Sequence, residues 1–179
     1  MKEGSREIHI VRAEKGEGSA ITEFVKSVKA TMGDESDWLF LNNSEDEMRR
    51  IDNGTDIAYR AVCADTGDTA GVLIVEIPSR FGGENLGTYI GLSEEELKKV
   101  AHMDTAAVAP AYRGLKLQRR LMERAEEELY AEGFRYFMCT VHPENIYSRG
   151  NITGLGYRPV WKGEKYGGTL REVMLKERA

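Results

Sequence analysis

The sequence predicts an α/β fold, and three observations predict it. Apolar runs typical of buried strands recur along the chain, and the segments between them carry apolar residues at helical spacing. A short turn joins two of the strand-like runs, which indicates an antiparallel hairpin. The chain has 179 residues, 41% of them hydrophobic and 31% charged, so we expect one domain, residues 1–179, with its own core.

The first predicted elements are a strand and two helices. Glu7–Arg12 alternates as a short strand does, and a helix follows between residues 19 and 33, with apolar side chains three and four positions apart. Trp38–Leu41 is a small apolar cluster. Ser44 and Glu47 have the spacing of a capping box, which predicts a second helix that ends near residue 54.

The middle of the chain predicts a hairpin and a short helix. Ile57–Ala64 and Ala70–Ile77 are the two strands, and the turn Asp65–Asp68 supplies the glycine and aspartates that suit a tight connection. Pro78–Leu92 is rich in glycine and has weak periodicity, so we expect a surface loop there. A short helix is expected at Ser93–Val100.

The last third predicts alternating strands and helices. The complete expected order is β-α-α-β-β-α-β-α-β-α-β-β. Its closing elements are a strand at Met103–Val108, a helix from Leu117 to Gly133, a strand at Phe134–Val141, a helix at Ser148–Leu155 and a final strand at Leu170–Lys176.

Composition excludes several classes of protein. The net charge of -5 comes from interspersed acids and bases, with no basic block for nucleic acid, so we expect no nucleic-acid partner. No stretch approaches the roughly 20 apolar residues of a membrane span, and the N-terminus lacks the apolar core of a signal peptide. Cys63 and Cys139 lie in strand-like runs, where a free thiol is typically a small buried hydrophobe. We therefore expect a cytoplasmic protein with no membrane partner.

The junction from strand to helix at Val108–Leu121 carries the strongest chemical signal. A strand that ends at proline, followed by Tyr-Arg-Gly and a helix, directs backbone N–H groups and a helix N-terminus at one point, which suits phosphate. Arg113 and Arg119 add charge-assisted donors that suit a pyrophosphate. The alternative interpretation is an ordinary turn into a helix.

A second polar cluster follows another predicted strand. Val141 is followed by His-Pro, and Asn145 and Ser148 then precede a short helix. If the two parallel strands separate at this point, the backbone between them lacks ladder partners and leaves a slot for an extended ligand.

With these segments the chain resembles the GNAT acetyltransferases. The resemblance covers Asp104–Lys176 and rests on Ala-Val-Ala-Pro-Ala-Tyr-Arg-Gly, Leu-Gln-Arg-Arg-Leu, His-Pro-Glu-Asn-Ile-Tyr-Ser and Leu-Gly-Tyr. It implies a mixed, mostly antiparallel twisted sheet with helices on both faces, splayed between the strands that end near Pro110 and Pro143. It also implies acetyl-CoA as co-substrate and no metal.

The resemblance also implies the residues that bind the co-substrate. Lys116 and Gln118 depart from the family pattern, because they stand where the family usually has two glycines. If the loop keeps ordinary helical dihedrals, both side chains can point away from the phosphates, and Lys116 can contribute charge. The residues carried over are the strand end Ala106, Ala107 and Val108, the loop and helix start Arg113, Gly114, Leu115, Lys116, Leu117, Gln118 and Arg119, and the polar pair Asn145 and Ser148.

Catalytic groups are less well marked. Transfer to an amine needs a base, oxyanion donors and an acid for the thiolate. We expect Asp104 as the base, with Glu76 second, and the resemblance implies a backbone N–H near Val108 as an oxyanion donor. The family's usual tyrosine acid is replaced by Ile152, so Tyr147 is the expected acid and His142 the other candidate. Each of these side chains also has a purely structural interpretation.

The expected activity is N-acetylation of a primary amine, in a small molecule or a peptide, by direct transfer without a cysteine intermediate. One alternative is a non-catalytic module that senses CoA or acyl-CoA, which the Ile152 substitution favours. A nucleotide-binding enzyme is more distant, because the Gly-Lys-Ser/Thr of that class is missing. A homodimer is the expected assembly, since exposed sheet edges often pair.

Overall fold

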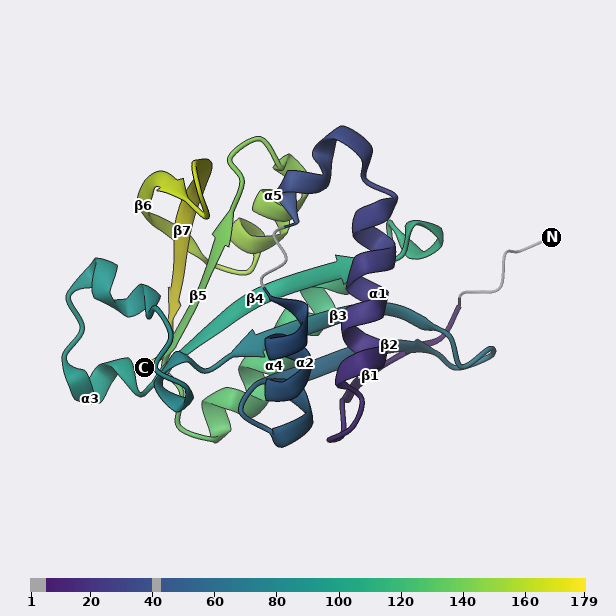
Figure 1. The fold of residues 1–179 in the computed structure, drawn as a ribbon, viewed down its shortest axis with the longest axis horizontal. Helices are drawn as coiled ribbons and strands as arrows, with labels where there is room; N and C mark the ends of the chain where they lie inside the picture. The colour runs from purple at the N-terminus through teal and green to yellow at the C-terminus, as the bar shows by residue number, and fades with distance from the viewer. Residues whose placement is uncertain (1–5, 40–42) are drawn as a thin grey trace.

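The computed structural model describes residues 6–39 and 43–179, and these form a seven-stranded sheet with helices on both faces (Figure 1). The spatial order of the strands is β1-β2-β3-β4-β5-β7-β6. The strands are β1 (Ile8–Arg12), β2 (Ile57–Cys63), β3 (Thr69–Glu76), β4 (Val100–Val108), β5 (Tyr136–Val141), β6 (Arg158–Lys165) and β7 (Thr169–Glu177).

Every strand pair of the described sheet is antiparallel except β4 with β5. This parallel pairing is short: it joins Val100 to Tyr136, Ala101 to Phe137 and His102 to Met138, and stops there. Beyond His102 the two strands separate, β4 staying paired to β3 and β5 to β7. The predicted mixed, mostly antiparallel sheet and its splayed central pair are therefore confirmed.

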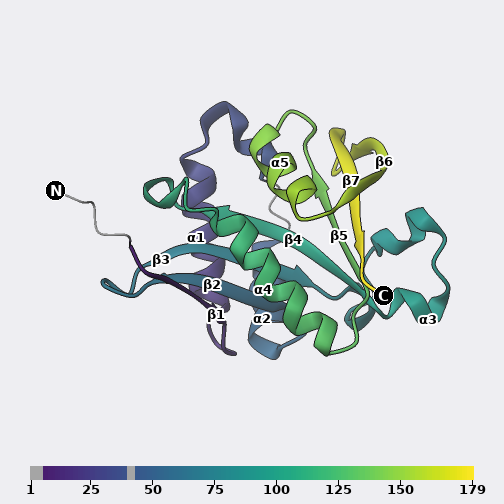
Figure 2. The same cartoon turned by 180° about the vertical axis from the view of Figure 1, so that it is seen from behind.

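Two hydrophobic layers hold the helices against the sheet (Figures 1 and 2). β3 alternates between them: Leu73 and Val75 pack on the side of α4 (Leu117–Ala131), whereas Val72 and Ile74 pack on the side of α1 (Gly18–Ala30). This alternation follows from the two-residue period of a strand. α2 (Ser44–Asn53) lies beside α1 on the same face.

The start of α2 differs from the predicted capping box. Asn43, not Ser44, is the N-cap, and its side chain accepts hydrogen bonds from the backbone N–H groups of Glu45 and Asp46. Glu47 is consequently free to turn inward, where it is fully buried. Of the predicted Trp38–Leu41 cluster, Leu39 is buried, whereas residues 40 and 41 lie outside the described part of the chain.

The region before β4 also differs from prediction. Residues 78–92 contain two 3₁₀ turns, Pro78–Arg80 and Leu86–Ile90. The predicted helix over residues 93–100 is only the four residues of α3 (Glu94–Leu97), which Ser93 and Glu96 close with a true capping box. β4 therefore begins at Val100, three residues earlier than predicted, because its first residues pair with β5.

The C-terminal elements follow the expected order. α5 (Ile146–Gly154) begins two residues before the predicted start, because Asn145 caps it and accepts a hydrogen bond from the Ser148 N–H. α4 and α5 lie on the same face of the sheet (Figure 2). Over the described residues, no helix is both long enough and apolar enough to cross a bilayer.

Candidate active site

A β-bulge in β4 sets the direction of one side chain at the centre of the molecule. Ile74 pairs with Thr105 and Val75 pairs with Met103, so Asp104 is an extra residue without a partner on β3. A bulge redirects the side chain at that point of the strand. Asp104 accordingly opens onto a cavity, between the buried residues Met103 and Thr105, and the walls of that cavity surround its carboxyl group and desolvate it.

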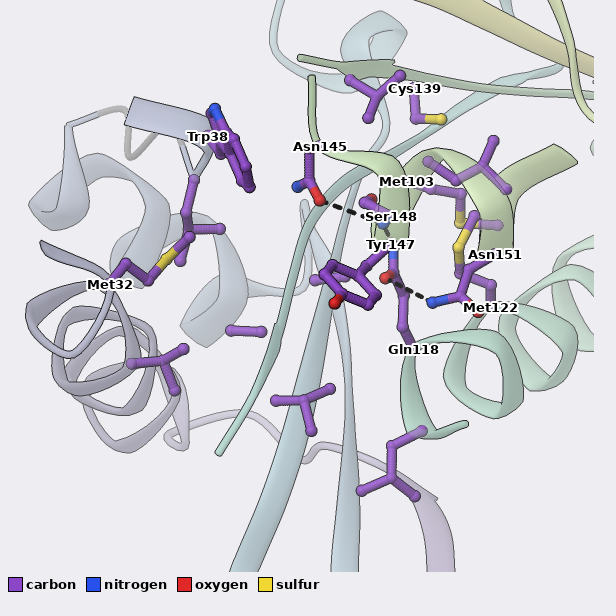
Figure 3. Close-up of a pocket in the computed structure, with 18 of the residues that line it drawn as sticks. Met32, Trp38, Met103, Gln118, Met122, Cys139, Asn145, Tyr147, Ser148 and Asn151 are labelled. Carbon is purple, nitrogen blue, oxygen red and sulfur yellow. Dashed lines mark hydrogen bonds between the residues drawn. The ribbon is translucent and has the colours of Figure 1, made fainter. Parts of the chain in front are cut away.

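A cavity of about 730 Å³ opens where β4 and β5 separate. Its walls are the end of α1, the 3₁₀ turn that carries Trp38, the outer half of β4, the start of α4, the end of β5 and the start of α5. Figure 3 shows Met32 and Trp38 on one wall, and Gln118, Asn145 and Ser148 facing them on the other. The cavity therefore follows the splay, as expected for a slot that takes an extended ligand.

The loop before α4 forms an open cradle of backbone groups. Gly114 has φ +85°, and a Cβ added to it would meet no heavy atom within 4 Å. Lys116 also has a left-handed backbone, with φ 57°, and is the N-cap of α4 without a side-chain hydrogen bond to the helix. The first N–H groups of α4 thus have neither an intrahelical acceptor nor a side-chain cap, and Arg113 and Lys116 stand beside them on the cavity wall.

Lys116, which replaces a glycine of the family pattern, has a left-handed backbone conformation. The expectation of ordinary helical dihedrals is wrong at this position, because the φ angle of Lys116 is positive. Glycine adopts this conformation more readily than other residues do. The lysine side chain is exposed. Lys116 therefore has, in place of the family's usual glycine, a backbone conformation that glycine adopts readily.

Gln118 connects the two helices that border the cavity. Its amide nitrogen donates to the Ser148 hydroxyl at 2.9 Å, and its amide oxygen accepts from the Asn151 side chain at 3.3 Å. Both bonds are visible in Figure 3. The second departure from glycine thus has a structural role, since it fixes α5 against the start of α4.

The inner end of the cavity is apolar and lacks a reactive thiol. Met103, Met122 and Ile152 line it together with Cys139. Burial is the main cause that raises the pKa of the Cys139 thiol far above its usual value, so this thiol stays neutral. Cys63 is buried in β2 and is not among the lining residues.

Three carboxyl groups meet at the bulge. One oxygen from each of Glu47, Glu76 and Asp104 lies within 4.8 Å of the other two, and among residues 6–39 and 43–179 no other group of three His, Cys, Asp or Glu side chains is so closely spaced. We call these residues the carboxylate trio. Such a group of oxygens could hold a cation.

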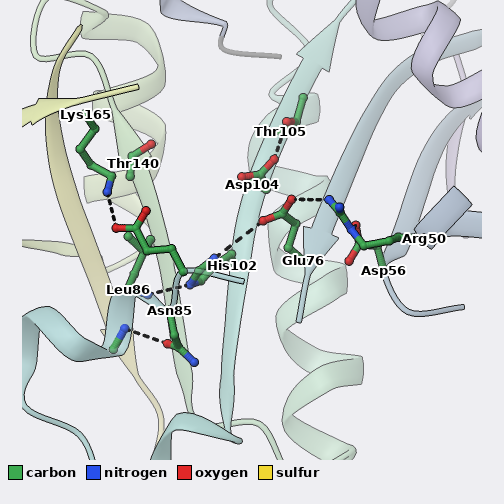
Figure 4. Close-up of polar contacts among 12 residues, drawn as sticks. Arg50, Asp56, Glu76, Asn85, Leu86, His102, Asp104, Thr105, Thr140 and Lys165 are labelled. Atoms are coloured by element: carbon green, nitrogen blue, oxygen red, sulfur yellow. Dashed lines mark hydrogen bonds and ion pairs between the residues drawn. The ribbon is translucent and has the colours of Figure 1, made fainter. Parts of the chain in front are cut away.

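The trio is only partly compensated by positive charge. Arg50 donates to Glu76 and to Asp56, at 2.8 Å in each case (Figure 4). Both Glu47 carboxylate oxygens are buried and have no hydrogen-bond partner among the described residues. Two of the three carboxylates thus lack a paired cation.

Burial raises the pKa of every member of the trio. It is the largest cause for Glu47, whose pKa rises to about 7, with the negative charge of Asp104 second. Burial is also the largest cause for Glu76, whose pKa rises to about 8, and for Asp104, whose pKa rises to about 6. The negative charge of Asp104 raises the pKa of Glu76 further, and that of Asp56 raises both. The trio therefore holds protons more readily than ordinary carboxylates do.

His102 lies beside the trio and is neutral. Its Nε2 accepts the Leu86 N–H at 3.0 Å, so Nδ1 carries the proton, 4.0 Å from a Glu76 oxygen. Burial lowers the pKa of His102 to about 4. His102 therefore supplies no positive charge to Glu76 near neutral pH.

Three tyrosines line the cavity, Tyr112 before α4, Tyr147 on α5 and Tyr166 between β6 and β7. Tyr147 is 80% exposed and projects from the start of α5 into the open space (Figure 3). The Tyr166 hydroxyl, on the turn between β6 and β7, lies 3.1 Å from the Thr140 hydroxyl, and burial raises its pKa. Arg171 lies next to Tyr166 and donates to the backbone oxygens of Asp37 and Trp38.

The cavity brings together 12 of the 14 site residues that the sequence predicts; Leu115 and Arg119 are not among its lining residues. Arg119 instead pairs with Glu123 on α4 at 3.3 Å. The sequence analysis missed Glu47 as a functional residue, because its spacing from Ser44 indicated a helix cap. Of the other candidates, Glu76 lies beside Asp104, whereas His142 accepts the Glu144 N–H and is not a lining residue.

The comparisons with known proteins give one family. The model described as the acetyltransferase (GNAT) family matches residues 36–157. No curated protein matches the chain. Similar solved structures include an acetyltransferase of the GNAT family from Streptococcus pneumoniae, with a TM-score of 0.70 and 18% identity over 97% of this chain and 100% of that one.

Two further structures share the fold at low identity. The ribosomal-protein-S18-alanine N-acetyltransferase from Escherichia coli has a TM-score of 0.67 and 15% identity, over 96% of this chain and 94% of that one. The protein yncA from Salmonella typhimurium, solved with its cofactor acetyl-CoA, has a TM-score of 0.65 and 17% identity, over 96% of this chain and 94% of that one.

Proposed function

Because this chain belongs to the acetyltransferase (GNAT) family, we propose that it transfers the acetyl group of acetyl-CoA to a primary amine of a small molecule or peptide. Members of this family are acyltransferases. The proposal treats residues 1–179 as one catalytic domain. The observation that carries it is the cavity in the splay between β4 and β5, which opens onto the uncapped N-terminus of α4.

The described residues fit the co-substrate at both ends of the cavity. The uncapped α4 N–H groups, Arg113 and Lys116 suit the pyrophosphate of CoA. The unpaired edge of β4, with Ala106, Ala107 and Val108, suits an extended amide-containing arm, which can hydrogen-bond to it as a strand does. When bound, acetyl-CoA supplies the activated acetyl group.

The carboxyl group of Asp104 is the proposed base. It lies at the bulge, open to the cavity, and its raised pKa brings it closer to that of the amine it has to deprotonate. Thr105 donates to one of its oxygens at 2.9 Å and fixes its orientation. A backbone N–H near Val108 is the proposed oxyanion donor.

Tyr147 is the proposed acid for the departing thiolate. It is the exposed tyrosine on the α5 wall, close to Ser148 and Asn145. Tyr166 is a second candidate because its hydroxyl enters the same cavity from the β6–β7 side. Comparing the rates of Tyr147→Phe and Tyr166→Phe assigns the acid, since only the acid's loss slows thiolate release.

Direct transfer is proposed over a cysteine intermediate. Cys139 is the thiol at the cavity wall, and its raised pKa keeps it protonated and a poor nucleophile. We expect Cys139→Ala to retain acetylation of an accepted amine. Abolished turnover in this variant, with acetyl-CoA binding intact, would contradict direct transfer.

A module that senses acyl-CoA without transfer is the second candidate function. The observation in its favour is Ile152, a buried residue at the position where the family usually has a tyrosine acid. Release of free CoA in the presence of a panel of amines separates the two, because a sensor binds acetyl-CoA without consuming it.

The first experiment is a calorimetric titration with acetyl-CoA. We expect micromolar binding that Arg113→Ala weakens about tenfold, since charge-assisted hydrogen bonds contribute roughly 1.5–3 kcal/mol. Arg124→Ala is the matched control, because Arg124 is an arginine of α4 that pairs with Glu128 and does not line the cavity. Absence of binding in the wild type would exclude both candidate functions.

A further inference from the structure

We infer, on the basis of the proposed acetyl transfer, that Glu47 and Glu76 join Asp104 in binding the acceptor, and that the acceptor is a primary alkylammonium ion held by the carboxylate trio. Glu47 and Glu76 come from α2 and β3, and Asp104 comes from the bulge of β4. The trio thereby places an acceptor site next to the splay between β4 and β5.

The spacing of the trio matches the three donors of one primary ammonium group. An –NH₃⁺ group points its three hydrogens in tetrahedral directions, and each charge-assisted hydrogen bond is about 2.8 Å long. The three acceptors around one such nitrogen therefore lie roughly 4.6 Å apart. In the trio, one oxygen from each carboxyl lies within 4.8 Å of the other two.

Glu47 supplies the independent evidence for a missing ligand. It is fully buried, and neither of its carboxylate oxygens has a hydrogen-bond partner in the part of the chain that the structure describes. A buried carboxylate normally has a compensating partner, because an unpaired one costs several kcal/mol in typical proteins. An ammonium ion between the three carboxyls would supply that partner.

The ligand reaches the trio from the cavity through Asp104. Asp104 lines the cavity and is exposed, whereas Glu47 and Glu76 lie behind it. Thr105 is the one side chain that hydrogen-bonds to Asp104 among the described contacts. The inference requires that the Asp104 side chain rotate to admit the ammonium group between the three carboxyls, a change typical of binding sites.

The surrounding charges favour a cation. Arg50 from α2 pairs with Glu76 and with Asp56, which precedes β2. His102 on β4 is neutral, and Thr105 contributes only a hydroxyl donor. Arg50 is thus the one arginine that pairs with the trio among the described residues, and Arg80 acts only on Asp56. When the carboxyl groups of the trio and Asp56 are ionised, they leave an excess of negative charge that a cationic acceptor neutralises.

Three acceptors in one site discriminate among amines. A primary alkylammonium ion satisfies all three carboxylates, whereas each N-methyl group removes one donor and leaves one buried carboxylate unpaired. Anilines are neutral near pH 7 and bring no charge to the site. The trio thus selects a primary aliphatic amine over both classes.

The trio also accepts the proton that acetyl transfer requires. The bound ammonium group gives one proton to a carboxylate, and the nitrogen lone pair then forms the N–C bond as the C–S bond breaks and its electron pair leaves on sulfur. The thiolate takes up a proton from Tyr147, the proposed acid, and the second proton lost by the nitrogen restores the tyrosine. The products are the N-acetyl amide, free CoA and one proton released through the trio.

The test uses n-pentylamine and N-methylpentylamine on the purified chain. We expect kcat/KM for n-pentylamine at saturating acetyl-CoA to exceed that for N-methylpentylamine by at least tenfold. Glu47→Gln should reduce this ratio toward unity and raise KM for n-pentylamine about tenfold. Glu45→Gln is the matched control, because Glu45 lies on the same helix but is exposed.

A binding measurement keeps the test independent of turnover. Calorimetric titration of the CoA-bound protein with n-pentylamine should give binding that Glu47→Gln weakens about tenfold, while the affinity for acetyl-CoA stays unchanged. The inference is overturned if kcat/KM is equal for the two amines, or if the Glu47→Gln variant binds n-pentylamine as tightly as the wild type. Neither outcome contradicts the proposed acetyl transfer. Binding of Ca²⁺ by the trio without any response to n-pentylamine also overturns it.

Failure of the proposed function gives a different result. In that case acetyl-CoA would bind, but no primary amine would cause release of CoA. Binding of n-pentylamine would still depend on Glu47. Acetylation that ignores N-methylation would instead contradict only the role of the trio.

Discussion

The ionised carboxylate of Glu47 destabilises the folded state. Its folded-state pKa of about 7 lies above its ordinary value, so the folded protein binds this proton more tightly than the unfolded chain does. The penalty is absent below the ordinary carboxyl pKa and fully present above about pH 7. We expect Glu47→Gln to raise the free energy of unfolding at pH 8 by about 2–3 kcal/mol.

Urea denaturation at pH 8 and pH 4 checks this prediction. The stabilisation should be largest at pH 8 and nearly vanish at pH 4, where Glu47 is protonated in the folded protein. Glu45→Gln should change stability by less than about 0.5 kcal/mol at either pH, since Glu45 is exposed. A pH-independent gain would mean that Glu47 is not ionised in the fold.

Asp104 makes a separate prediction about rate. Because burial raises its pKa, the carboxylate is lost as pH falls at a higher pH than an ordinary aspartate would be, and kcat/KM should fall with it. Asp104→Asn should lower kcat by about 10²–10⁴-fold and remove this acidic limb from the pH profile. Retention of the limb in the variant would assign it to another group.

The backbone conformation of Lys116 affects the stability of the fold. With φ 57° it occupies a conformation that costs a residue with a Cβ roughly 1–2 kcal/mol. Lys116→Gly should therefore hold or slightly raise the melting temperature, whereas Lys116→Val should lower it, because β-branching makes this conformation worse. Equal melting temperatures for the two variants would argue against a left-handed residue at this position.

At the scale of elements, α5 depends on Gln118 for its position. Gln118→Ala removes both bonds that join α4 to α5. Net losses of about 1 kcal/mol per hydrogen bond predict an acetyl-CoA affinity that falls severalfold. Asn151→Ala removes only one of the two bonds and should have a smaller effect in the same titration.

Elements with strong local signals could be predicted from the sequence. The stripe of Leu117, Leu121, Ala125 and Leu129 predicts α4, which the structure contains with these residues buried. The turn Asp65–Asp68 predicts the β2–β3 hairpin in the same way. The order of the elements follows from such local patterns, and the splay follows from the family resemblance.

Features that depend on distant residues could not be predicted. The start of β4 is decided by pairing with Tyr136, which lies far along the chain. The sequence alone therefore predicts Val100 as the end of a helix and assigns residues 101 and 102 to no element. The bulge at Asp104 is a register shift against β3, and no local pattern marks it. Glu47 reaches the site only because Asn43, rather than Ser44, caps α2.

At the scale of the whole molecule, the outermost strands decide how copies of the chain meet. β1 and β6 lie at the two edges of the described sheet. A homodimer stays a prediction, and an edge with unpaired backbone groups is the expected contact. Sedimentation velocity should give a species of twice 20.1 kDa, whereas a single 20.1 kDa species would contradict it.

The short parallel pairing between β4 and β5 divides the sheet into two units that few hydrogen bonds connect. Only three residue pairs join β1–β4 to the β5–β7–β6 unit, so this seam is the weakest line through the described sheet. An extended ligand that lies along β4 would act there as an additional strand. It would supply the hydrogen-bond partners that β5 does not give to the outer half of β4. Filling the slot should therefore slow amide hydrogen exchange across the outer half of β4, and emptying it should let the two pieces move against each other again.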